Sequence, residues 1–165
     1  MRFRFGPQLV VLVLILIAVP SWAKGPKPVS AKRFESAAQA ALEAMKKRAA
    51  ELNIQGVAVV SFAPGDTIQN WSSQMAVVGH MTDHTNGDKG NNLLGIAYAK
   101  ASEMANTLKD SGTSGRTPMT GEFGWQGGVT TRIPGGAIIV AFSGGKSEDD
   151  VEVSKAGLAI LKARL

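Results

Sequence analysis

The chain has 165 residues, a formal net charge of +5 and no cysteine. That length suffices for one domain with a single hydrophobic core, and the lack of cysteine excludes disulfides and a lipid anchor on cysteine. Apart from residues 46–48 the basic side chains are scattered, and no aromatic residues interleave with a basic stripe, which argues against a nucleic-acid partner.

The first 23 residues have the pattern of a secretory signal peptide. Two arginines precede an apolar run of 11 residues, Leu9 to Val19, and small residues stand where a signal peptidase would cleave after Ala23. The run is far shorter than the roughly 20 residues of a membrane span. We expect a signal peptide over 1–23, an exposed leader over 24–29 and one domain over 30–165. The protein is then periplasmic or secreted, with no stable membrane insertion after cleavage.

The first half of the domain is predicted to contain a helix followed by two strand regions. Residues 30–52 carry apolar side chains at helical spacing, with Ser30 as N-cap. The run VAVVSFA, residues 57–63, is typical of a buried strand and ends at a Pro-Gly-Asp turn. A second strand region, in two pieces, is expected within 67–81. The polar stretch 82–92 has the composition of a loop.

The second half returns to a helix and then to strands. Residues 93–110 place Leu, Ala and Met on one helical face, and Gly112 ends that helix. The runs 127–133 and 137–143 are joined by Pro-Gly-Gly and predict a hairpin, and a last helix runs from 148 to about 164. This order favours an α+β fold with an antiparallel five-stranded sheet flanked by three or more helices.

The corner before the last helix resembles the end of a nucleotide-binding loop. It reads Ser-Gly-Gly-Lys-Ser at 143–147, but the first glycine of that motif would have to stand at Val140. Acidic residues follow at 148–150, where they complement the positive end of a helix and repel phosphate. Ser147 followed by Asp150 matches a capping box. We interpret the segment as a strand-to-helix corner capped by Ser147, without a nucleotide.

The C-terminal stretch GWQGGVTTRIPGGAIIVAFSGGKSEDDVEVSKAGL carries a family resemblance. Together with the Ala-rich first and central helices and GVAVV before a hairpin, it resembles the GlcG/HbpS-like haem-binding family, over almost the whole chain after the predicted signal. The resemblance implies a profilin- or PAS-like α+β domain and makes the Ser-Gly-Gly corner part of the family signature. The chain departs from the family pattern at Ser61, where an aspartate is common, and at residues 80–83, which match Arg-Met-Asp-Gly only in part.

The resemblance implies haem as a possible cofactor. His80 and His84 are the only histidines, and an imidazole or a thioether such as that of Met81 can ligate haem iron. Trp125 and Arg132 belong to a patch of aromatic and polar residues beside glycines that can line a small-molecule pocket. We therefore take these five residues as candidate cofactor-binding residues. The alternatives are that the histidines are ordinary loop residues and that the patch is covered sheet surface.

Two classes of function stay open. The first is a secreted or periplasmic small-ligand binding protein, with a haem-binding carrier or sensing role. The alternative is an enzyme or accessory protein acting on a small metabolite such as a hydroxy acid. The sequence contains no nucleophile motif, and Ser143 has no histidine partner nearby in sequence, so capture of a ligand is favoured over turnover.

A homo-oligomer is also expected. The apolar runs 57–63 and 137–143 lack the alternation of a half-exposed strand, so something must cover both of their faces. Small residues on the Ala-rich helices allow close contact between helices, within one subunit or between two. The family resemblance implies a symmetric assembly as well.

Overall fold

The computed structural model describes residues 29–85 and 89–165. The predicted signal peptide and almost all of the leader lie outside the described residues, so both stay predictions. Within the described part of the chain, no helix is long and apolar enough to cross a membrane.

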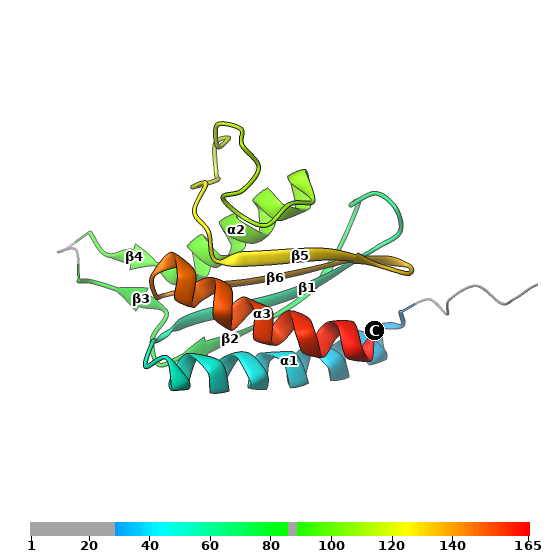
Figure 1. Ribbon diagram of the computed structural model, residues 1–165, viewed down its shortest axis with the longest axis horizontal. Coiled ribbons are helices and arrows are strands. Elements are labelled where there is room, and N and C mark those ends of the chain that lie inside the picture. The colour runs from blue at the N-terminus through cyan, green and yellow to red at the C-terminus, as the bar shows by residue number, and fades with distance from the viewer. Residues whose placement is uncertain (1–28, 86–88) are drawn as a thin grey trace, which may run out of the picture.

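The chain folds into an antiparallel sheet, a separate two-stranded ribbon and helices on both faces of the sheet (Figure 1). The strands of the sheet are β1 (Gly56–Pro64), β2 (Ser72–Val78), β5 (Gly128–Ile133) and β6 (Gly136–Ser143). The ribbon consists of β3 (Thr82–Asp83) and β4 (Asn91–Asn92). The helices are α1 (Ala31–Glu51), α2 (Leu93–Thr107) and α3 (Ser147–Arg164).

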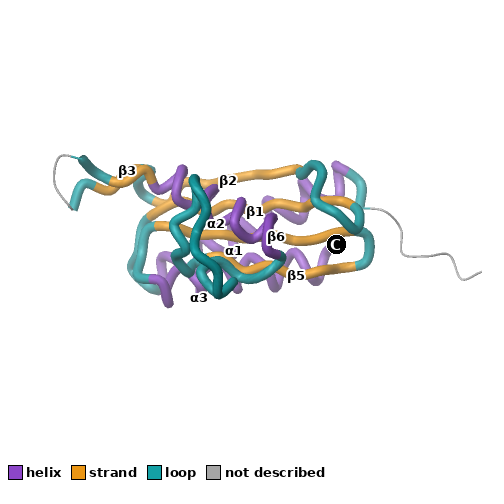
Figure 2. Tube along the Cα trace, turned by 90° about the horizontal axis from the view of Figure 1, so that it is seen from above, coloured by secondary structure: helices purple, strands orange, loops and turns teal. Residues whose placement is uncertain are grey.

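The α+β class and the antiparallel sheet are confirmed, and the strand count needs correction. The main sheet has four strands in the order β2-β1-β6-β5, which lie side by side in Figure 2. The expected first piece of the second strand region is a loop, because Ile68 and Trp71 turn inward and pack on the core. The polar stretch expected to be a loop instead pairs with itself as the ribbon, through Thr82 opposite Asn92.

One face of the sheet is covered by α1 and α3, which lie together below it in Figure 1. Alternate side chains of the two central strands point to this face, since side chains alternate along a strand. They include Val60 of β1 and Val140 of β6, both fully buried in the main core cluster. Gly157 of α3 lets the two helices approach closely, because a side chain there would press against Met45 of α1.

The opposite face of the sheet is covered by α2 of the same chain. Val57 and Val59 of β1 pack with Ile96 and Ala97 of α2, so both faces of the central strands are buried, as predicted. The sequence left open whether this cover comes from the same subunit or from a second one, and α2 of the same chain provides it. Burial of both faces of the central strands therefore gives no support to a homo-oligomer, which stays a prediction.

The corner at residues 143–147 is a strand-to-helix turn, but its cap differs from the one expected. Ser147 is the first residue of α3 and Lys146 is the N-cap. The side chain of Lys146 makes no capping hydrogen bond. Asp150 supplies the missing acceptor instead, since its Oδ1 accepts a 2.8 Å hydrogen bond from the backbone N–H of Gly145. Our interpretation of Ser147 as the helix cap was wrong because the helix begins one residue earlier than expected.

Candidate functional site

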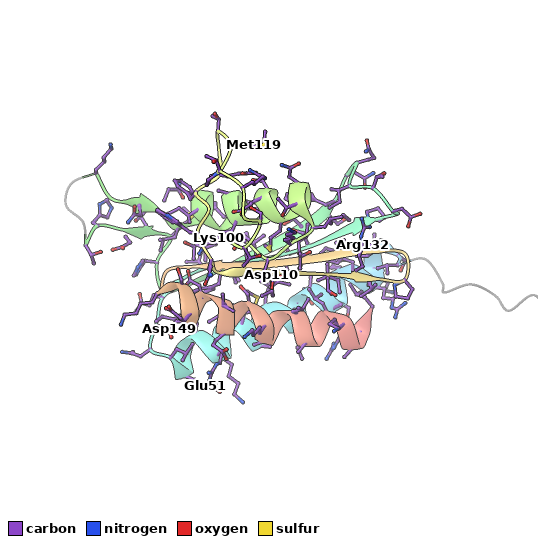
Figure 3. The ribbon with its side chains drawn as sticks, turned by 45° about the horizontal axis from the view of Figure 1, so that its top comes forward. Glu51, Lys100, Asp110, Met119, Arg132 and Asp149 are labelled. Carbon is purple, nitrogen blue, oxygen red and sulfur yellow. The ribbon has the colours of Figure 1, made fainter. Side chains whose placement is uncertain are left out.

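A buried ion pair joins α2, β6 and α3 at the end of the sheet that carries the ribbon. Lys100 Nζ lies 2.8 Å from Asp150 Oδ2, and both side chains are only 4% exposed. Lys100 Nζ also donates to the carbonyl oxygen of Phe142 at 2.8 Å. Figure 3 shows Lys100 on the side of α2 that faces the sheet. Gly127 packs directly on this ammonium, since a Cβ at that position would overlap Nζ.

Burial shifts the pKa of each partner so that its neutral form is favoured. Loss of hydration lowers the pKa of Lys100, and the carboxylate of Asp150 counteracts this. Loss of hydration raises the pKa of Asp150, and Lys100 together with the backbone N–H groups of Gly145 and Gly144 counteracts that. With a 2.8 Å separation and a hydrogen-bond partner on both carboxylate oxygens, we take the pair as ionised at neutral pH.

The sequence predictions missed Lys100 and gave Asp150 too small a role. Asp150 lies in the first turn of α3, where an interaction with the helix dipole was a sufficient explanation. Lys100 lies one turn after Ile96 and one turn before Met104, on the buried and mostly apolar face of α2. A charge on such a face requires a partner when it is buried, and this was the available signal.

A small cavity, here called the inner cavity, lies beside this pair. It has a volume of about 270 Å³. Its lining combines the ion pair, the corner before α3, the ribbon and one aromatic residue, and the residues are Asp83, Asn91, Leu93, Ile96, Lys100, Trp125, Gln126, Ser143, Gly144, Gly145, Ser147 and Asp150. The corner that resembled a phosphate loop therefore does line a cavity, although acidic residues surround it.

A second cavity, here called the Trp125 groove, adjoins the inner cavity and has a volume of about 360 Å³. Its walls are the ribbon, the start of α2 and the loop before β5, and the residues are Gly90, Asn91, Asn92, Gly95, Ile96, Ala99, Gly121, Phe123 and Trp125. Phe123 and Trp125 are stacked, with ring centroids 4.7 Å apart, yet they are 47% and 49% exposed. The groove thus presents an aromatic wall that the described residues leave uncovered.

One of the five candidate cofactor-binding residues, Trp125, lines this groove. His84 is not a lining residue, but its ring lies next to the lining residue Gly90, since a Cβ on Gly90 would come within 2.7 Å of His84 Nδ1. His80 and Met81 precede the ribbon and are exposed, and neither is among the lining residues of the groove or the inner cavity.

Arg132 lies apart from the other four candidates, toward the far end of β5, where Figure 3 labels it. Its guanidinium donates to the carbonyl oxygens of Gly65 at 3.1 Å and Asp66 at 2.6 Å. It thereby fastens the loop between β1 and β2 at the edge of a third, more open cavity of about 590 Å³. Trp125 and Arg132 therefore do not form one patch.

The loop that carries the aromatic wall is braced by a partly buried ion pair. Arg116 and Glu122 are 2.7 Å apart, and the second carboxylate oxygen of Glu122 accepts from the backbone N–H of Met119 at 2.9 Å. Met119 stands at the top of this loop in Figure 3. The hydrogen bonds from Arg116 and Met119 lower the pKa of Glu122 from 4.5 to about 2. The loop is therefore ordered by a carboxylate that stays ionised in mild acid.

This brace predicts a pH dependence of the loop. A depressed pKa contributes stability that is complete above pH 4.5 and is lost as the pH falls toward 2. An NMR titration of the Glu122 carboxyl should give a midpoint near 2. In Arg116→Met the midpoint should move toward the ordinary value of 4.5. A midpoint near 4.5 in the unaltered protein would show that the brace does not form in solution.

No protein-family model matches the chain, and a comparison with curated proteins gives no match either. Two solved structures share its fold. Protein ORFY of Klebsiella pneumoniae, described by the family model DUF336, aligns with a TM-score of 0.55 and 18% identity over 78% of this chain and 89% of that one. A complex of PduOC with haem aligns with a TM-score of 0.52 and 16% identity over 81% of this chain and 95% of that one.

These neighbours are GlcG-like or DUF336 proteins. At such low identity the likeness shows the fold alone. The resemblance noted in the sequence is thus matched at the level of architecture, and one protein with this architecture was solved with haem bound.

Proposed function

We propose that the protein binds a flat, largely apolar small ligand in the Trp125 groove, and that this ligand is haem. The carrying observation is the stacked Phe123–Trp125 pair, which is half exposed and lines a groove whose other lining residues include Gly90, the neighbour of the His84 ring. Exposed apolar surface that lines a groove is typical of a ligand-binding site. The PduOC–haem complex supports the choice of haem, because it shows that a protein of this fold accepts that ligand.

The residues of the groove fit a porphyrin in chemical character. Phe123 and Trp125 offer aromatic faces for the macrocycle, and Ile96 and Ala99 add an apolar floor. His84, whose ring lies next to Gly90 of the groove lining, offers an imidazole for the iron, and an imidazole is an established haem ligand. Haem would supply its own iron chemistry when bound, and the protein would hold and orient it.

We further propose that the protein works by capture, as a carrier or sensor in the periplasm or outside the cell. The segment over residues 1–23 supports this location. Catalysis on a small metabolite, the alternative, gains no support from Ser143, because among the described residues its hydroxyl has no base as a hydrogen-bond partner. A homo-oligomer would be compatible with the exposed aromatic wall, which a second copy or a ligand can cover.

Titration with haemin, followed by the Soret band, tests the proposal. The unaltered protein should give a saturable shift of the band. His84→Ala should lose the imidazole-ligated spectrum, and Trp125→Ala should weaken binding by about tenfold through the lost stacking.

His80→Ala is the matched control, because His80 is exposed and it is the ring of His84 that lies next to the groove residue Gly90. It should bind haemin as the unaltered protein does. Absence of a saturable Soret shift would refute haem binding. Loss of the spectrum in His80→Ala with retention in His84→Ala would refute the assignment to this groove.

A further inference from the structure

The inner cavity contains a buried hydroxyl that the fold does not use. Ser143 is 4% exposed, and its side chain lies on the α2 face of β6, because Ile139 and Ala141 pack on that face. Among the described residues, no hydrogen bond is made by its Oγ. No buried side-chain N or O atom in the described part is left unpaired, so this oxygen must reach the open space of the cavity that Ser143 lines.

The inner end of the cavity is rich in hydrogen-bond donors. Besides the Ser143 hydroxyl it holds the ammonium of Lys100, which has three N–H groups. Two of these are engaged with Phe142 and Asp150. Each oxygen of the Asp150 carboxylate already accepts a hydrogen bond, one from Lys100 and one from Gly145. An acceptor group such as a carboxylate therefore fits this end.

The side of the cavity formed by the ribbon has the opposite character. Asp83 of β3 lines it, and its carboxylate is fixed by the backbone N–H and the hydroxyl of Thr85, each at 2.9 Å. Trp125 stands on the same lining, and its ring face attracts a cation. An ammonium group fits here.

The charges of the whole lining exclude a simple anion. Lys100 is its only basic residue among those described, and it faces two carboxylates, Asp83 and Asp150. A ligand with a lone negative charge would meet a site with an excess of negative charge. A ligand that carries both signs meets complementary partners at both ends.

We propose that the inner cavity binds a small zwitterion, an amino acid whose carboxylate meets Ser143 and Lys100 and whose ammonium meets Asp83 and Trp125. The volume of about 270 Å³ suits a molecule of this size and excludes haem. The inner cavity shares Asn91, Ile96 and Trp125 with the Trp125 groove. It is nevertheless a separate site, because the ion pair and Ser143 belong to the inner cavity alone.

Isothermal titration calorimetry without haem tests this inference. Glycine, β-alanine and γ-aminobutyrate are the probes, because they differ in the separation of the two charges. Acetate and ethylamine each carry one of the two groups. We expect at least one amino acid to bind about tenfold or more tightly than either half-molecule. Ser143→Ala and Asp83→Asn should each weaken that binding by about fivefold or more.

Ser72→Ala is the control of matched chemistry, since Ser72 is exposed on β2 and outside the cavity. It should leave the affinity unchanged. The proposal is overturned if none of the three amino acids binds, if acetate binds as tightly as the best of them, or if Ser143→Ala and Asp83→Asn both retain full affinity. Haemin binding is recorded separately through His84→Ala, so the failure of one site does not decide the other.

Discussion

Replacing Lys100 by methionine is expected to lower the free energy of unfolding by about 3–5 kcal/mol, the cost of leaving a buried charge without its partner. The substitution keeps the length of the side chain and removes the ammonium. Asp150 would then be buried without its cation, and the carbonyl oxygen of Phe142 would lose its donor. Equilibrium denaturation with urea measures the change through the shift of the midpoint.

Lys155→Met is the matched control on α3. The Lys155 side chain is 60% exposed and only pairs with Glu152 at 3.4 Å, so the change should stay within about 0.5 kcal/mol. Adding Asp150→Asn to Lys100→Met should restore at least about 1 kcal/mol, because the double variant has no unpaired charge. A Lys100→Met protein as stable as the Lys155→Met control would show that the pair is not buried in solution.

The second large effect is expected from Gly144→Ala, at about 3 kcal/mol or more. Gly144 has φ +155, and a Cβ at this position would overlap the carbonyl oxygen of Gln55 and lie 2.6 Å from Gly56 Cα. Both neighbours are backbone atoms that cannot move without shifting β1. The same urea denaturation measures the change, and the cavity would be distorted with the corner.

Gly135→Ala separates crowding from backbone strain. Gly135 also has a positive φ, +93, but a Cβ there would meet nothing within 4 Å. Its substitution should cost only the strain of the left-handed conformation, about 1 kcal/mol. Equal losses at Gly144 and Gly135 would mean that the close approach of the corner to β1 is not rigid.

The elements that pack an apolar face against the core could be predicted from the sequence, whereas the polar ribbon could not. The helices and the central strands follow from apolar spacing, which reports burial directly. The ribbon was not predicted, because strands of two residues are too short to show an alternation of apolar and polar side chains. Asn91 and Asn92 are also typical of loops. Asn92 also caps α2 by accepting from the N–H of Gly95 at 3.0 Å, a role that the polar composition concealed.

The candidate site was less predictable than the fold. Lys100 and Asp150 come from different helices, and only the packing of α2 and α3 against opposite faces of one sheet brings them together. His84 and Trp125 were both named from the sequence, but the placement of His84 beside Gly90, which lines the same groove as Trp125, depends on how the ribbon turns. Arg132 lies on β5, which begins at Gly128, the last of the glycines that suggested a pocket, and the length of the strand carries Arg132 to the other end.

The strand order also governs how the sheet can form. β1 with β2 and β5 with β6 are local hairpins, whereas the central pair joins β1 to β6, from Val57 opposite Ser143 to Pro64 opposite Gly136. Each hairpin alone leaves an apolar strand, β1 or β6, without a partner on one side. These two strands can pair only when the long segment between the hairpins, which includes α2, closes into a loop. Such distant pairing slows folding relative to local contacts. During synthesis the first hairpin must therefore wait for nearly the entire chain, with β1 exposed to non-native association until β6 emerges.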